Sequence, residues 1–280
     1  MEEKKEKCGC SERDEVKREL SLKTTVSAIK KKILVLSGKG GVGKSTVSTN
    51  LAVGLSKKGF QVGLLDIDIH GPNIPNMLGL YGFAPTITDM GIFPLKLFDN
   101  LNVISIGFFL EEKDSPVVWR GPLKHRMIEQ FLSDVRWGAL DYLVVDSPPG
   151  TGDEIISIVQ LLDQIDGTVI VATPQDVALA DVRRSIKFCK DASIPILGIV
   201  ENMSGFVCPH CGNTVEIFKT GGAEKVAEEY NIPFLGKIPI DPQIVNAGDE
   251  GKPMMIYFAE SKSAKAFGEI IDKITNELKI

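Results

Sequence analysis

The stretch Gly38-Lys39-Gly40-Gly41-Val42-Gly43-Lys44-Ser45-Thr46 decides the fold of this chain. It follows a short apolar run, Ile33–Leu36, and opens an amphipathic stretch, Ser45–Lys58. It therefore satisfies the pattern G-x-x-x-x-G-K-[ST] in the strand–loop–helix context that a phosphate-binding loop requires. Glycines let successive backbone N–H groups point at phosphate oxygens, and the positive end of the following helix adds to the attraction. We expect Lys44 to bind the terminal phosphates of a nucleotide and the Ser45 hydroxyl to ligate Mg²⁺.

Short apolar runs continue along the chain from this loop and alternate with amphipathic stretches. The runs are continuous, which is typical of parallel strands covered on both faces. We therefore predict the α/β class: a single P-loop NTPase domain, with a mostly parallel twisted sheet and helices on both faces. The predicted strands are Ile33–Leu36, Val62–Leu65, Val103–Ile106, Tyr142–Val145, Thr168–Ala172, Ile196–Val200 and Phe234–Ile238. The predicted helices are Ser45–Lys58, Gly121–Trp137, Asp153–Leu162, Ala178–Lys190 and Gly222–Tyr230.

The domain is expected to cover residues 30–280, preceded by a flexible charged leader, residues 1–29, that carries Cys8 and Cys10. Cys189 lies among apolar residues of a predicted helix and is expected to be a small core residue. The C-terminal stretch has apolar residues at helical spacing and acidic interruptions, which favours a helix packed on the core over a membrane-targeting tail. Its apolar positions are Phe267, Ile270, Ile271, Ile274 and Leu278.

Composition and charge exclude several classes of protein. The chain has 280 residues, of which 25% are charged, and its formal net charge is −5. A mildly acidic chain without a long basic block is a poor candidate for nucleic-acid binding. The longest apolar run, Met254–Ala259, is far shorter than the roughly 20 residues of a membrane-spanning helix. The first 20 residues lack the apolar stretch of a secretory signal. We expect a cytoplasmic protein that binds neither nucleic acid nor membrane.

Carboxylates follow two of the predicted strands. Asp66 and Asp68 come directly after Val62–Leu65, and Asp146 follows Tyr142–Val145. Ligands of α/β proteins bind at the carboxyl edge of the sheet, which places all three beside the phosphate loop. Asp146 is expected to hold Mg²⁺ through water. Aspartates at strand ends also cap helices, but three at one edge favour the functional interpretation.

The pair Cys208 and Cys211, with Pro209 and His210 between them, lies in a loop after the strand Ile196–Val200. Two thiolates at this spacing grip one side of a tetrahedral metal or one edge of an iron–sulfur cluster. The same spacing is also typical of a redox pair or a zinc knuckle. The remaining ligands come either from a second subunit or from Cys8 and Cys10.

The second residue of the loop, Lys39, narrows the class of P-loop protein that the chain resembles. GKGGVGKST resembles the deviant Walker A box of the MinD/ParA/nitrogenase iron-protein class of dimeric ATPases. That resemblance implies that Lys39 reaches the nucleotide of a partner subunit; the alternative is a solvated loop charge. It also implies that Asp68 positions the attacking water and that Asp66 lies near the Mg²⁺ shell. Because Lys39 predicts a homodimer, a second subunit is the favoured source of the missing thiolates.

Longer stretches resemble the Mrp/ApbC-type iron–sulfur cluster carrier ATPases: GKGGVGKST, DIDIHGPNIP, WRGP at 119–122, DYLVVDSPPGTGDE, TPQDVAL and ENMSGFVCPHCG. The resemblance implies a slow, Mg²⁺-dependent ATPase that holds a [4Fe–4S] cluster between two subunits, at Cys208 and Cys211, and transfers it to apo-proteins. It further implies that Asn202 reads the adenine and that Pro239, with Ile240 and Asp241 after it, lines the base pocket. The alternative is a partition or positioning ATPase of the ParA/MinD type with a structural zinc at the cysteine pair.

Overall fold

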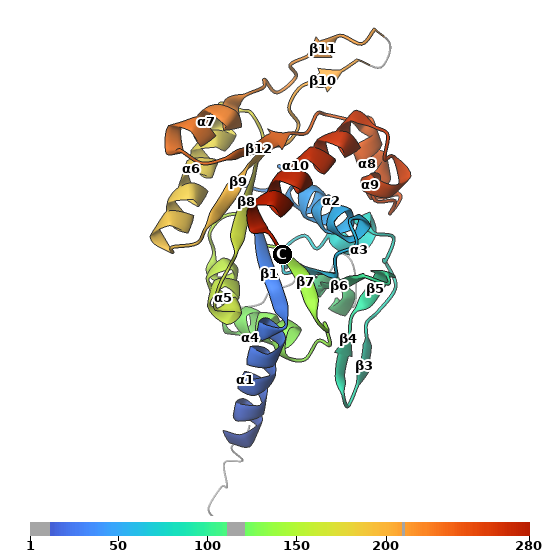
Figure 1. Ribbon diagram of the computed structural model, residues 1–280, viewed down its shortest axis with the longest axis vertical. Coiled ribbons are helices and arrows are strands. Elements are labelled where there is room, and N and C mark those ends of the chain that lie inside the picture. Colours follow the sequence, from blue (N-terminus) through green and yellow to red (C-terminus); the bar gives the residue numbers. More distant parts are fainter. Residues whose placement is uncertain (1–11, 111–120, 209–210) are drawn as a thin grey trace, which may run out of the picture.

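The computed structural model describes the backbone of residues 12–110, 121–208 and 211–280. Its centre is an eight-stranded sheet with strand order β12-β9-β8-β1-β7-β2-β6-β5 (Figure 1). All neighbouring strands are parallel except the edge pair β5–β6. The bounds are β1 (Ile29–Ser37), β2 (Val62–Asp66), β5 (Leu95–Phe98), β6 (Leu101–Ser105), β7 (Leu140–Asp146), β8 (Gly167–Ala172), β9 (Ile196–Glu201) and β12 (Phe234–Lys237). The predicted α/β class and mostly parallel sheet are confirmed.

Helices cover both faces of this sheet, as expected. One face carries α2 (Lys44–Lys57), α3 (Ile74–Met77), α8 (Pro242–Asp249), α9 (Met254–Tyr257) and α10 (Lys262–Leu278). The other carries α1 (Glu12–Ser27), α4 (Gly121–Ser133), α5 (Asp153–Leu162), α6 (Asp176–Asp191) and α7 (Gly222–Tyr230). In β1, Ile33 and Val35 pack on the first side and Leu34 and Leu36 on the second, all fully buried. Burial on both faces explains why the strands read as continuous apolar runs.

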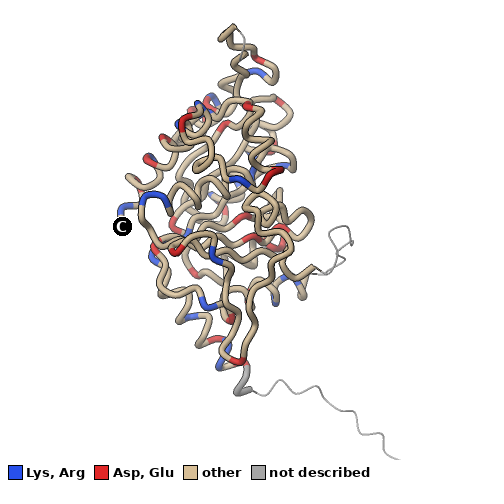
Figure 2. The backbone as a smooth tube through the Cα atoms, turned by 90° about the vertical axis from the view of Figure 1, so that its right-hand side faces the viewer, with Lys and Arg blue, Asp and Glu red and all other residues tan. Residues whose placement is uncertain are grey.

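The C-terminal helix α10 packs on the core, as predicted. Its five apolar positions, Phe267 to Leu278, belong to the cluster around α2 and β1. No helix in the described ranges is long and apolar enough to cross a lipid bilayer. Basic and acidic residues are interspersed along the chain (Figure 2), and many are paired, such as Lys30 with Asp141 at 2.8 Å.

The predicted leader needs correction in its second half, because residues Glu12–Ser27 form α1. Leu22 and Val26 pack against the part of the core to which α4 contributes, and the Ser21 hydroxyl donates a hydrogen bond to Ser133 O at 2.6 Å. Few apolar residues make this contact, so the helix shows little apolar periodicity in sequence. Cys8 and Cys10 lie outside the described residues.

Two small hairpins and a 3₁₀ turn add to the predicted elements. The first hairpin pairs β3 (Thr86–Thr88) with β4 (Gly91–Phe93), and η1 (Ile106–Phe109) follows β6. The second hairpin pairs β10 (Phe206–Val207) with β11 (Thr214–Val215) and projects from the body of the molecule beyond β9 (Figure 1). Both hairpins pair short, partly or fully exposed strands, which leave no continuous apolar run in the sequence.

Candidate functional site

The phosphate loop is tightly held at its two ends and open in the middle. A Cβ atom at Gly38 would lie 2.5 Å from the backbone of Asp181, and one at Gly43 would lie 2.1 Å from Asn202 Nδ2. Over Gly40 and Gly41 there is no heavy atom within 4 Å of the corresponding positions. Gly41 and Gly43 adopt positive φ angles of 78° and 84°, which side chains rarely tolerate. The loop therefore has the open, backbone-lined shape that a phosphate group needs.

Asp146 gathers the polar side chains at the start of α2. Lys44 Nζ lies 2.8 Å from Asp146 Oδ1, and the same oxygen accepts a hydrogen bond from the Ser48 hydroxyl at 2.6 Å. The Ser45 hydroxyl donates to Asp146 Oδ2 at 2.7 Å. The pairing of β7 with β1 sets Asp146 beside Val35, just ahead of the loop. The predicted Lys44, Ser45 and Asp146 thus meet, and Ser48 joins them without having been predicted.

Asp66 and Asp68 belong to the same group of polar side chains around Lys44 and Asp146. Asp66 pairs in register with Asp146 on β7, and its Oδ2 accepts a hydrogen bond from the Ser105 hydroxyl at 2.7 Å. Asp66 Oδ1 accepts from the backbone N–H of Asp68 at 3.0 Å. Asp68 Oδ2 is 3.5 Å from Lys44 Nζ, and its Oδ1 accepts from the N–H of His70. The three carboxylates predicted at the sheet edge are therefore close together.

This crowding of carboxylates changes their ionisation. Burial and the neighbouring Asp146 carboxylate raise the pKa of Asp66 to about 8. Burial also raises the pKa of Asp68, against the opposing effect of Lys44. Burial alone would lower the pKa of Lys44, but the charges of Asp146, Asp68 and Asp66 raise it overall. Carboxylate and hydroxyl oxygens in negative excess are the donor set that Mg²⁺ prefers, so the residues present fit a magnesium-bound nucleotide.

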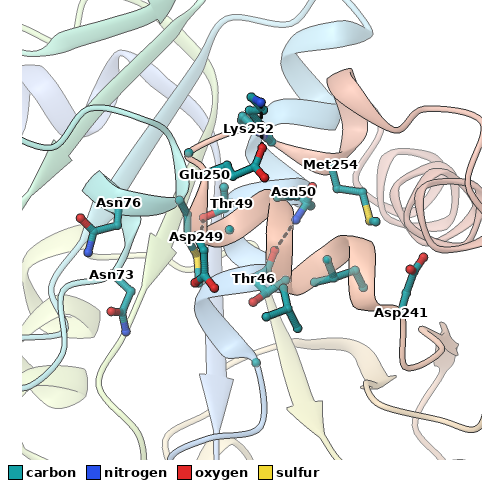
Figure 3. Close-up of a pocket in the computed structure, with 18 of the residues that line it drawn as sticks. Thr46, Thr49, Asn50, Asn73, Asn76, Asp241, Asp249, Glu250, Lys252 and Met254 are labelled. Carbon is teal, nitrogen blue, oxygen red and sulfur yellow. Dashed lines mark hydrogen bonds and ion pairs between the residues drawn. The ribbon is translucent and has the colours of Figure 1, made fainter.

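A cavity of about 760 Å³ opens beside the phosphate loop (Figure 3). Gly43 and Thr46 line it together with Asn202 and Pro239, so the residues predicted to bind the base do adjoin the loop. Asn202 Nδ2 donates a hydrogen bond to Val42 O at 2.9 Å, which leaves its amide oxygen as the remaining acceptor. A cavity of this size is typical of small-ligand sites.

Several cavity residues were not predicted. Figure 3 shows Thr49 and Asn50 from α2 opposite Asn73 and Asn76 from the α3 segment. The last two lie within or just after DIDIHGPNIP, a stretch used above for its family resemblance without any role for its asparagines. Asp241 was predicted to line the base pocket and does line the cavity, but its carboxylate already accepts hydrogen bonds from Gln243 N, which caps α8, and from the Ser263 hydroxyl.

Lys39 differs sharply from Lys44. Lys44 is 6% exposed and paired, whereas Lys39 is only half-buried on the loop. No hydrogen bond or ion pair joins Lys39 to another of the described residues. A cation without a partner in the described part of the chain is compatible with the predicted reach across a subunit interface.

The cysteine pair lies on the projecting hairpin. Cys208 directly follows β10, its N–H donates to Asn213 O, and its carbonyl accepts from Gly212 N, both at 2.9 Å. Cys208 is half-buried and Cys211 exposed, and neither forms a disulfide. Within residues 12–110, 121–208 and 211–280, no histidine, cysteine or acidic side chain joins this pair to make a group of three or more that could hold a metal. His210 lies outside the described residues.

Cys189 is fully buried in the core, as predicted, and burial raises the pKa of its thiol to about 11. A thiol in these surroundings is inert as a nucleophile or ligand. The chemistry of the described cysteines is therefore confined to the hairpin.

Comparison with known proteins gives consistent results. The family model described as ParA, NUBPL iron-transfer P-loop NTPase, matches residues 28–275. An iron–sulfur cluster carrier protein of Methanocaldococcus jannaschii is 49% identical over 261 residues, covering 93% of this chain and 89% of the relative. A nucleotide-binding protein of Archaeoglobus fulgidus, solved in complex with ADP, is 40% identical with a TM-score of 0.74, covering 84% and 92% of the two chains. The cell-division ATPase MinD of Pyrococcus furiosus is 27% identical with a TM-score of 0.65, covering 88% and 99%.

Proposed function

The chain belongs to the NUBPL iron-transfer P-loop NTPase family, and on that premise we propose that it is an ATP-driven iron–sulfur cluster carrier. Two copies hold a [4Fe–4S] cluster as cargo between their Cys208 and Cys211 thiolates and pass it to apo-proteins. Each copy binds and slowly hydrolyses Mg²⁺-bound ATP. Cys208 and Cys211 form no disulfide with another described residue, which suits a reducing cytoplasm.

One observation carries this proposal: the phosphate loop and the cysteine hairpin rise from the same edge of one sheet. The loop follows β1 and the hairpin follows β9, and both strands belong to the parallel part of the sheet. The carboxyl ends of parallel strands lie at one edge, so the nucleotide and the thiolates share it. In the proposed function, ATP is hydrolysed at the same sheet edge from which the cargo-binding hairpin leaves.

In this function, the residues around Asp146 divide the work of phosphoryl transfer. Lys44 neutralises the terminal phosphates, while Ser45 and Asp146 hold the metal, Asp146 through water. Bound Mg²⁺ supplies further charge neutralisation at the phosphates. Asp68 orients the attacking water, and the buried Asp66 supports the metal shell through its bond to Ser105. The oxygen of Asn202 accepts a hydrogen bond from the adenine amino group, and Pro239 lines the base pocket.

A homodimer completes both halves of the site. Lys39 reaches the partner's nucleotide, where a charge from outside contributes to the transition state as an arginine finger does. A two-fold axis also joins two cysteine pairs into the four thiolates that a [4Fe–4S] cluster requires.

Anaerobic reconstitution tests the proposal. We expect about four iron and four sulfide per two chains, on a dimer measured by light scattering. Cys208→Ala and Cys211→Ala each lose the cluster and retain ATP binding. The matched control Cys189→Ala, a buried thiol of the same chain, keeps it. Zinc without sulfide, bound at the same cysteines, would instead support the positioning-ATPase alternative.

A further inference from the structure

Glu201, the last residue of β9, sits at the base of the segment that carries the cysteine pair. This segment, described over residues 204–208 and 211–220, is called the cysteine arm. The Glu201 carboxylate accepts hydrogen bonds from the Ser204 hydroxyl at 2.5 Å, at the start of the arm. It also accepts from Gly221 N at 2.8 Å and Ala223 N at 2.7 Å, beyond the end of the arm. One side chain thus binds both ends.

The arm's two ends also meet each other directly. The Ser204 hydroxyl lies 2.8 Å from the Thr220 hydroxyl, so Ser204, Thr220 and Glu201 form one junction. Glu201 is fully buried, and no lysine, arginine or histidine within the described residues forms an ion pair with it. Its charge is instead stabilised by these donors and by the N-terminal end of α7, where backbone dipoles favour an anion.

The same junction adjoins the nucleotide cavity. The next residue, Asn202, lines that cavity and donates to Val42 O in the phosphate loop. At the start of the arm, Ser204 N donates to Ile238 O, and Gly205 O accepts from the N–H of Ile240, a cavity residue. The returning half of the arm contributes Phe218 to the cavity wall. The returning half of the arm therefore lines the cavity, and the outgoing half is hydrogen-bonded to a residue that lines it.

We propose that Glu201 is a positioning residue that couples the nucleotide cavity to the cysteine arm, an inference that rests on the proposed function. Asn202 and Phe218 both line the cavity, so a nucleotide bound there would contact both. Because Glu201 ties both ends of the arm to β9, the arm responds as one body. Coupling of this kind needs only that the nucleotide bind one arrangement more tightly than another.

The test compares Glu201→Gln with Glu224→Gln in cluster-free protein. Glutamine keeps the shape of Glu201 but puts an NH₂ group where one backbone N–H now donates, so one bond to the end of the arm is lost. Glu224 lies on α7, and its exposed side chain pairs with Lys237 at 2.7 Å, so its loss leaves the junction intact. Hydrogen exchange of amides 204–223 is measured with and without a non-hydrolysable ATP analogue.

In wild type and in Glu224→Gln, we expect the analogue to slow exchange in the arm by at least about fivefold, the low end of typical coupling between sites. In Glu201→Gln, the analogue still binds, but this ratio falls to about one. A merely structural role would lower protection equally with and without nucleotide and leave the ratio unchanged. Ser204→Ala, which removes one of the three bonds, gives an intermediate ratio if Glu201→Gln is too unstable to measure.

An unchanged ratio in Glu201→Gln, or no nucleotide effect in the wild-type arm, would overturn the inference. Loss of analogue binding in Glu201→Gln would also overturn it, because the residue would then shape the cavity itself. These outcomes are independent of the cluster. Failure of the proposed function appears instead as absent iron and sulfide after reconstitution.

Discussion

Replacing Lys44 with methionine tests whether the ion pair with Asp146 holds the ligand-free site together. Methionine has a similar length and no charge, so the change leaves Asp146 and Asp68 without their cation at 2.8 and 3.5 Å. Lys44 and Asp146 are 6% and 1% exposed at their side chains, so water does not replace the lost partner. Removing one partner of a buried pair typically costs about 3–5 kcal/mol.

The group of carboxylates around position 44 can limit this cost by binding a proton. Protonating a carboxyl group of ordinary pKa about 3.9 at pH 7 costs about 4 kcal/mol, since each pH unit is worth about 1.36 kcal/mol. We therefore expect Lys44→Met to lose about 3–4 kcal/mol at pH 7. Its folded state binds a proton that the unfolded chain releases, so the penalty shrinks as pH falls, to about 1.5 kcal/mol at pH 5.

Urea unfolding in the presence of a chelator, followed by circular dichroism, measures the penalty at both pH values. Lys58→Met is the matched control: its pair with Asp272 lies at 2.5 Å, but the two side chains are 39% and 58% exposed. Exposed pairs contribute about 0–1 kcal/mol. The double variant Lys44→Met/Asp146→Asn should recover part of the loss. A penalty below about 1 kcal/mol for Lys44→Met at pH 7, or one independent of pH, would refute the reasoning.

Three further predictions concern the partner subunit, the thiols and the base. Lys39→Ala should retain ATP binding but lower the rate of hydrolysis by a factor of about 10³–10⁵. Mixing Lys39→Ala subunits with Asp68→Ala subunits should restore up to about half of wild-type activity per mixed dimer. Demonstrated mixed dimers without activity would show that Lys39 acts within its own subunit. Iodoacetamide should label the two hairpin cysteines in the native protein and Cys189 only after unfolding, because burial raises the pKa of the Cys189 thiol to about 11; native labelling of all three, seen by mass spectrometry, would contradict this. Asn202→Ala removes both the hydrogen bond to Val42 O and the proposed acceptor for the adenine amino group. Calorimetry should therefore find ATP binding weakened by about tenfold and the preference for ATP over GTP reduced. An unchanged preference would exclude Asn202 from base recognition.

The parts of the fold that sequence predicted well are those where local pattern and burial agree. In β1, Ile33 and Leu34 are both fully buried on opposite faces, so the strand is apolar throughout and easy to recognise. Helix α1 had no such pattern, because it rests on the core mainly through Leu22 and Val26 while Val16 and Leu20 are 63% and 65% exposed. Its position depends on α4, which lies far along the chain.

The candidate site divides in the same way. Lys44 and Asp146 were predicted because Lys44 begins α2 directly after the phosphate loop and Asp146 ends β7, a strand that the sequence pattern identifies. Glu201 and Phe218 could not be, since their role depends on how the arm folds back onto the cavity. For Asp241, the sequence predicted the position beside the cavity but not the partners of the side chain. Its carboxylate accepts hydrogen bonds from Gln243 N, at the start of α8, and from the Ser263 hydroxyl.

The arrangement around Lys44 also makes the two ligands of the site depend on each other. Lys44 now neutralises Asp146, the residue assigned to the metal. When its ammonium group turns to a phosphate, Asp146 loses its cation and can stay charged in a buried place only if a divalent ion replaces it. Conversely, a metal that approaches Asp146 while Lys44 is still paired meets a neighbouring positive charge. Phosphate and metal therefore bind best together, so that the resting ion pair itself discriminates against either ligand alone.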